Sequence, residues 1–139
     1  MSLFGYLKGF LGASPRISEM TRSYLQTALY TSSDEDGRPL DRDYSESDFS
    51  DEAMSKADQD VTKFAFDNGH LYVRIGISNA DVGRLFWHAR TGSGITFMDN
   101  FKTGSVEEKI AKTLHANAKK YGEASVYVGD DGELEIFTG

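Results

Sequence analysis

The chain has 139 residues, enough for one domain with one hydrophobic core. It contains no cysteine, which excludes disulfide frameworks and thiolate chemistry, and no apolar run near the roughly 20 residues that span a bilayer. A net charge of −7 argues against direct binding to nucleic acid. No basic segment precedes an apolar stretch at the N-terminus, so we expect a cytoplasmic protein without a signal peptide or a membrane partner.

Residues 1–20 are expected to form an amphipathic extension, and residues 21–139 a single α+β domain. Apolar side chains in segment 3–11 recur at helical spacing, but two glycines weaken that helix. A helix this short is marginal in water, so it must dock on the body, on another copy or on a partner. Contact between copies through residues 3–11 is therefore one interpretation of this segment.

Two helices are expected in the first half of the domain. Ser18 begins the first, whose apolar stripe continues over residues 18–30. Ser50 is a favourable N-cap for the second, and Asp51 and Glu52 follow it in the first turn, near the positive end of the helix dipole. We expect this second helix to end at Asp67-Asn68-Gly69.

Three further segments follow. Residues 71–77 have the composition of a strand, although a buried irregular link is an equal alternative. Ser78 and Asp81 resemble a capping box, which predicts a short helix over 79–85. A longer helix is expected over 105–121, with acids near its start and lysines near its end.

Two hairpins complete the predicted fold. Residues 86–99 contain two aromatic and β-branched runs joined by Thr-Gly-Ser-Gly, with Trp87 on the buried face and His88 and Arg90 on a partly exposed face. An Asp-Gly turn between alternating runs predicts a second hairpin over 124–137. The expected fold class is α+β, a small antiparallel sheet of two hairpins packed against three main helices.

Acidic residues are concentrated in segment 34–60, which holds eleven acids and three bases. A surface of this kind usually serves solubility, but it also matches a protein partner with a basic surface. Asp34 and its neighbours partly match a calcium loop, although an Asx-turn explains them better, and we expect no metal site. The expected acidic face consists of Asp34, Glu35, Asp36, Asp41, Asp43, Glu46, Asp48, Asp51 and Glu52.

Segments 24–44, 84–99 and 125–132 carry three blocks in order: YLQTALYTSSDEDGRPLDRDY, a run containing FWHARTGSG, and SVYVGDDG. These blocks resemble a family of small uncharacterised proteins encoded widely in bacteriophage and mobile-element genomes. The two histidines of that family's pattern fall on Arg84 and Ser93, and its second tryptophan falls on Met98. The resemblance implies an origin in such a genome and no particular reaction.

Our leading functional hypothesis is a non-enzymatic binding protein of phage or mobile-element origin. An acidic inhibitor of a host defence or nucleic-acid-handling protein is the form to test first. We expect no cofactor and assign no catalytic residue.

The alternative is a small-molecule or nucleotide site at the 84–99 hairpin, in which arginines hold an anion and Asp99 orients a histidine. An exposed Arg–Asp pair across the hairpin explains the same residues without a ligand. The candidate binding residues of this alternative are Arg84, Trp87, His88, Arg90, Ser93 and Asp99.

Overall fold

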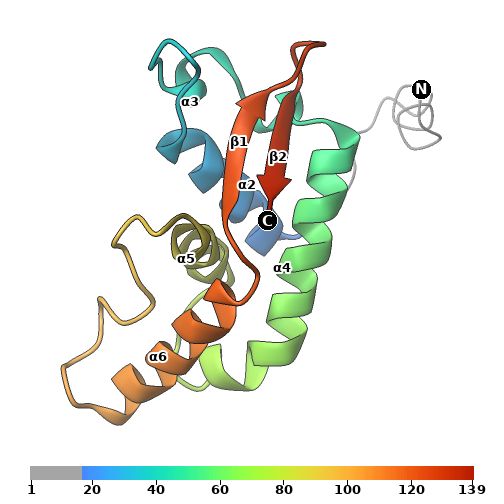
Figure 1. Ribbon diagram of the computed structural model, residues 1–139. Coiled ribbons are helices and arrows are strands. Elements are labelled where there is room, and N and C mark those ends of the chain that lie inside the picture. The colour runs from blue at the N-terminus through green and yellow to red at the C-terminus, as the bar shows by residue number, and fades with distance from the viewer. Residues whose placement is uncertain (1–16) are drawn as a thin grey trace.

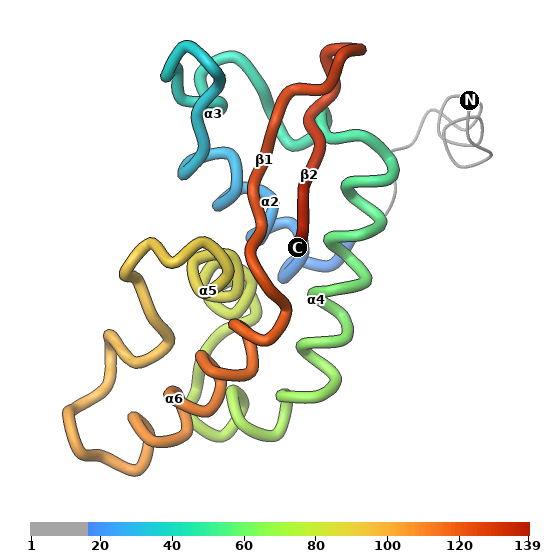
Figure 2. The backbone as a smooth tube through the Cα atoms, in the orientation of Figure 1, coloured from blue at the N-terminus to red at the C-terminus, as the bar shows by residue number. Residues whose placement is uncertain are grey.

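Helices surround a single antiparallel hairpin in the part of the chain that the structure, a computed structural model, describes, residues 17–139 (Figure 1). The hairpin stands beside α2 and α4 at one end of the molecule, and α6 lies at the other end (Figure 2). The elements are α2 (Glu19–Thr31), α3 (Leu40–Asp43), the 3₁₀ helix η1 (Glu46–Asp48), α4 (Asp51–Tyr72), α5 (Asn79–Thr91), α6 (Val106–Lys119), β1 (Ala124–Val128) and β2 (Leu134–Thr138).

Serine N-caps begin the four long helices within residues 17–139, as the sequence predicts. In each case the serine hydroxyl oxygen accepts a hydrogen bond from the backbone N–H three residues later, at 3.0 to 3.1 Å. This bond satisfies one of the N–H groups that a helix leaves unpaired at its start. The four caps are Ser18, Ser50, Ser78 and Ser105.

The hairpin predicted over 86–99 is wrong. The helix that Ser78 begins continues through this segment to Thr91, and Gly92 ends it in the left-handed conformation, with φ of 65°. The aromatic run of this segment is typical of a strand, but here it belongs to a helix that is buried on most of its faces. The predicted turn residues therefore form a helix C-terminus and the loop that follows it.

The predicted end of the second helix at residues 67–69 is also wrong, because α4 continues to Tyr72. Inside the helix, the Asn68 amide donates to the carbonyl of Phe64 at 2.9 Å, so its side chain is satisfied without ending the helix. Residues 73–77 then form turns and a link, with Gly76 at φ of 75°. The strand expected over 71–77 is therefore absent. The alternative of a link is correct for residues 73–77, but its expected burial is wrong, because Val73 is 70% exposed.

The α+β class is confirmed, but the sheet has two strands from one hairpin rather than four from two. β1 and β2 pair antiparallel in the register Ala124↔Thr138 to Val128↔Leu134. Leu134 is fully buried, and its carbonyl accepts from the backbone N–H of Ser50 at 2.9 Å. This bond fixes the hairpin against the start of α4.

Aromatic rings fill the core between α2, α4 and α5. Phe64 stacks on Phe86 with ring centroids 4.5 Å apart, and Tyr24 meets Trp87 edge to face at 5.2 Å. Trp87 is 1% exposed, so the prediction of its burial is confirmed, although helix packing rather than strand alternation is the cause. Gly83 lets α2 and α5 approach closely, because a Cβ there would collide with the carbonyl oxygen of Met20.

The helix and the contact between copies expected at residues 3–11 lie outside the described residues. The boundary expected after residue 20 falls inside α2, where Met20 is already buried in the core. Among residues 17–139, the structure contains no helix whose length and apolar character would allow it to cross a bilayer.

Candidate binding surface at the acidic end

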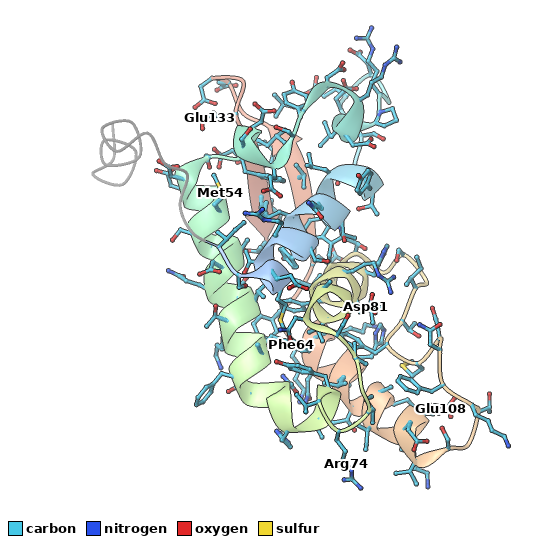
Figure 3. The ribbon with its side chains drawn as sticks, turned by 180° about the vertical axis from the view of Figure 1, so that it is seen from behind. Met54, Phe64, Arg74, Asp81, Glu108 and Glu133 are labelled. Carbon is cyan, nitrogen blue, oxygen red and sulfur yellow. The ribbon has the colours of Figure 1, made fainter. Side chains whose placement is uncertain are left out.

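Acidic side chains from several segments of the chain gather at one end of the molecule. The nine residues of the expected acidic face lie on the 33–39 turn, α3, η1 and the first turn of α4. The hairpin turn lies beside them, and Glu133 appears at this end, opposite Arg74 and Glu108 (Figure 3). The hairpin adds four carboxylates that we had not included: Asp130, Asp131, Glu133 and Glu135. We call these thirteen carboxylates the acidic end.

Several of these acids hold the local backbone. The carboxylate of Asp34 accepts from the N–H groups of Asp36 and Arg38, both at 2.9 Å, which is an Asx-turn. Asp48 accepts from the N–H of Ser45 at 2.7 Å in a capping box. These bonds fix the turns, and the carboxylates on the turns are therefore held in fixed positions.

The hairpin and the start of α4 are joined by a polar contact at the same end. The Ser50 hydroxyl donates to the carboxylate of Glu135 at 2.9 Å. Desolvation, followed by the charges of Asp131, Glu135 and Asp51, raises the pKa of Glu133. Desolvation is the larger cause of this rise, and the smaller contributions come from carboxylates of the hairpin and of α4 that repel a charge on Glu133.

The charge is unevenly distributed over the described residues. The segments of the acidic end carry thirteen carboxylates and two arginines, Arg38 and Arg42, and Arg22 on α2 pairs with Glu46 at 3.4 Å. The rest of residues 17–139 carries eleven bases and nine acids. A surface with this excess of one sign attracts cationic partners and repels phosphates.

A groove of about 590 Å³ runs between the acidic turn and β1. Residues 33–36 form one wall, β1 residues 126–128 form the other, and Tyr44 also lines it. A second hollow of about 410 Å³ lies beside the outer part of the hairpin and is lined by Asp130, Asp131 and Glu135 among others. Apolar, aromatic and acidic groups therefore meet in one concave region.

Arg90, proposed above as an anion ligand, is a core residue that is 3% exposed. Its guanidinium donates to the carboxylate of Asp60 at 2.8 Å, to the hydroxyl of Tyr24 at 3.1 Å, and to the carbonyls of Tyr121 at 3.0 Å and Gly122 at 3.1 Å. These bonds join α5 to α4, to α2 and to the link before β1. The expected partial exposure of Arg90 and its expected role as an anion ligand are therefore wrong, and no hairpin exists over residues 86–99 across which an Arg–Asp pair could form.

Trp87 is also directed into the core, where its indole N–H donates to the Thr31 hydroxyl at 2.9 Å. Burial, only partly offset by the charge of Arg90, raises the pKa of Tyr24 to about 12. The Tyr24 hydroxyl thus stays protonated inside the network. Neither Trp87 nor Arg90 is placed to contact a ligand.

The other four candidate residues make local contacts. His88 is 6% exposed, so its expected partial exposure is wrong, and its Nδ1 lies 2.8 Å from the Ser93 hydroxyl. Asp99 accepts from the hydroxyl of Thr96 at 2.6 Å, and Arg84 pairs with Asp81 on its own helix.

The loop over Thr91–Gly94 belongs to the 84–99 segment, for which a small-molecule or nucleotide site is the alternative hypothesis. It follows the C-terminus of α5, where the helix dipole disfavours an anion. Cavities lined by described residues lie beside α4 and α6, β1, the hairpin and α3, and residues 84–99 line none of these four. The geometry required for a small-molecule site at 84–99 is therefore lost.

No family model, curated protein or solved structure matches this chain. The interpretation of the acidic end accordingly stands on its own geometry.

The buried His88 and the half-buried His115 predict how stability depends on pH. Burial, together with the positive charge of Arg84, lowers the pKa of His88 below its ordinary value of 6.5, and burial with Lys119 lowers that of His115. The unfolded chain binds protons at these two histidines more readily than the folded chain does. Their contribution to the free energy of unfolding is therefore fully present above pH 6.5 and is lost as the pH falls through the lowered pKa values.

The measurement is urea unfolding over this pH range. H88Q should reduce the acid-side loss of stability, whereas H70Q, which changes an exposed histidine at the end of α4, serves as the control. Equal pH profiles for the wild type and H88Q would contradict the prediction for His88.

Proposed function

We propose that this chain is a non-enzymatic binding protein whose acidic end docks on a basic surface of a partner protein. The observation that carries the proposal is the gathering of thirteen carboxylates, from the 33–52 region and the hairpin, at one end of the molecule. Had the acids been spread over all faces, solubility would explain them. A concentrated patch of one sign instead gives steering and specificity toward a complementary surface.

The resemblance to phage and mobile-element proteins extends this proposal. In that setting the chain acts in the cytoplasm of the host. Its partner there is a host defence protein or a nucleic-acid-handling protein, whose basic groove normally receives phosphates. A dense array of carboxylates competes for such a groove because it presents negative charge at comparable density. The same charge keeps the chain itself away from nucleic acid.

The test is affinity capture from a bacterial lysate with a variant in which three exposed acids are neutralised, E35Q/D41N/D43N. None of these three side chains makes a hydrogen bond or ion pair in the described structure, so the fold should be retained. We expect the wild type to capture basic proteins at low salt and to lose them between about 0.1 M and 1 M salt, where the Debye length shortens. The variant should capture markedly less.

The matched control removes the same charge elsewhere. E19Q/E107Q/E123Q neutralises three exposed acids on α2, on α6 and before β1. This control should capture the same proteins as the wild type. Equal loss in the two triple variants, or capture that is insensitive to salt, would overturn the proposal, because net charge or apolar contact would then be the cause.

A further inference from the structure

The outer edge of β1 is the feature that goes beyond charge. Glu123 and Gly139 exchange both backbone hydrogen bonds, at 3.1 and 3.0 Å, which fixes the phase of the hairpin. In an antiparallel pair, residues alternate between those bonded to the partner strand and those whose N–H and C=O point away from it. By this alternation and the register, Val126 and Val128 direct their backbone groups away from β2.

These outward groups have no partner among residues 17–139. No backbone or side-chain hydrogen bond to Val126 or Val128 exists beyond the β1–β2 ladder, and the isolated bridges of the described chain lie elsewhere, at Ser33↔Pro39 and Phe49↔Leu134. Both valines instead line the 590 Å³ groove. Unpaired edge groups are a template for another strand, and folded proteins normally cover or blunt them.

The groove offers two further kinds of contact. Tyr127, which is 52% exposed, and Tyr44 supply aromatic surface, the side-chain type that is enriched in protein interfaces. Glu35 and Asp36 on the opposite wall are exposed, and their carboxylates make no hydrogen bond or ion pair in the described structure. Carboxylates and aromatic faces both favour Lys and Arg side chains.

We infer that the groove receives an extended, Lys- or Arg-containing segment of the partner, which adds as a third strand along the free edge of β1. The inference rests on the proposed function and states how the partner is held. Backbone groups of the added strand pair with Val126 and Val128, and its basic side chains reach Glu35 and Asp36. Main-chain bonds supply affinity in this mode, and the side chains supply selectivity.

Charge decides between this occupant and a second copy of the chain. Pairing β1 with β1 of another copy would bring two acidic ends together, each with thirteen carboxylates and two arginines. Like charges placed side by side in an interface disfavour association. A basic segment instead brings positive charge to the acidic end, so its binding offsets the repulsion among the carboxylates there.

The test uses a fluorescent peptide of about eight residues, alternating Lys and Thr, long enough to cover one strand. Fluorescence anisotropy measures its binding to the full chain. Two further peptides carry N-methyl groups on alternate amides, one in each phase, so that every peptide keeps the same charge. We expect one phase to bind about tenfold or more weakly than the parent peptide, because it cannot donate to β1, and the other to bind like the parent.

Two protein variants complete the design. V128P removes the outward N–H of Val128, at a position where an edge strand tolerates proline, and V128A, which also loses the valine side chain, keeps that N–H as the matched control. V128P should weaken binding of the parent peptide while V128A should not. E35Q/D36N should also weaken binding of the parent peptide, and the affinity that remains should depend less on salt concentration.

The outcomes separate this inference from the proposed function. If both methylated peptides bind like the parent, strand addition is overturned, while lysate capture that depends on the acidic end would leave the proposed function intact. Unchanged binding to E35Q/D36N would overturn the basic character of the occupant. A wild-type dimer in sedimentation velocity that V128P converts to monomer would identify a second copy as the occupant and overturn the inference.

Discussion

Replacing Arg90 with methionine should lower the free energy of unfolding by about 3–5 kcal/mol, because it leaves a buried partner charge unpaired. Methionine retains most of the side-chain volume, so a cavity contributes little. The loss comes from the Asp60 carboxylate, the Tyr24 hydroxyl and two backbone carbonyls, all of which lose a donor in the interior. Urea unfolding followed by circular dichroism measures the change.

The control for this prediction lies on the same helix. Arg84 pairs with Asp81 at the surface, at 3.4 Å, so R84M should cost only about 0–1 kcal/mol. If R90M and R84M lower stability equally, the network around Arg90 does not stabilise the fold as we argue. Lys56, which pairs with the other oxygen of Asp60 at 2.9 Å, partly compensates that carboxylate and sets the lower end of the expected range.

Replacing Gly83 with alanine should destabilise the protein by about 1–3 kcal/mol, the usual cost of overpacking a core. Alanine normally stabilises a helix relative to glycine by about 1 kcal/mol, so the expected sign is opposite to that of helix propensity. The reason is the backbone of α2: the added Cβ would meet the carbonyl oxygen of Met20 and lie 3.2 Å from the Cβ of Ser23. Backbone atoms cannot rotate away, so α2 and α5 would have to separate.

Gly69 provides the matched control. It also lies inside a helix, α4, but a Cβ there would meet the Tyr72 side chain, with the hydroxyl oxygen at 3.8 Å and ring carbons at 4.0 Å, which is ordinary contact. G69A should therefore raise stability by about 0.5–1 kcal/mol, following propensity alone. Thermal unfolding of the two variants should move in opposite directions, and a stabilised G83A would show that the crossing of α2 and α5 is not limited by Gly83.

Helix starts could be predicted well, because their causes are local. A serine whose hydroxyl caps the third following N–H needs only its neighbours, and Ser18, Ser50, Ser78 and Ser105 all behave this way. The hairpin over 124–137 is local for the same reason, since Asp-Gly favours its turn. The C-terminal ends of helices were harder to predict. Asn68 and Gly69 are residues that typically end a helix, yet α4 extends past them, where it packs against α6.

The error over residues 86–91 has a tertiary cause. Phe86, Trp87, His88, Ala89 and Arg90 are all buried, so the segment lacks the polar face that identifies a surface helix. A continuous buried run fits a strand or a core helix equally well in sequence. Only the partners decide, and those lie far away in the chain, as Arg90 and Asp60 show.

The candidate site could be predicted in part. Local composition identifies the acids of segment 34–52. Their proximity to the acids of the hairpin, however, depends on the contact of Leu134 with Phe49 and Ser50. The pairing of Ser50 with Glu135 spans 85 residues, and no short-range pattern encodes it. The free edge of β1 was likewise hidden, because the sequence predicted a second hairpin that could have covered it.

The separation of charge between the two ends has a consequence for encounter kinetics. With its negative excess at the hairpin turn and a slight positive excess over the remaining described residues, the molecule has an electric dipole directed along its length. Near a cationic surface the field turns such a molecule before contact, so that collisions occur mostly with the groove facing inward. Orientation of this kind raises the fraction of productive collisions and thus the association rate constant, while the lifetime of the complex is set by the contacts made afterwards.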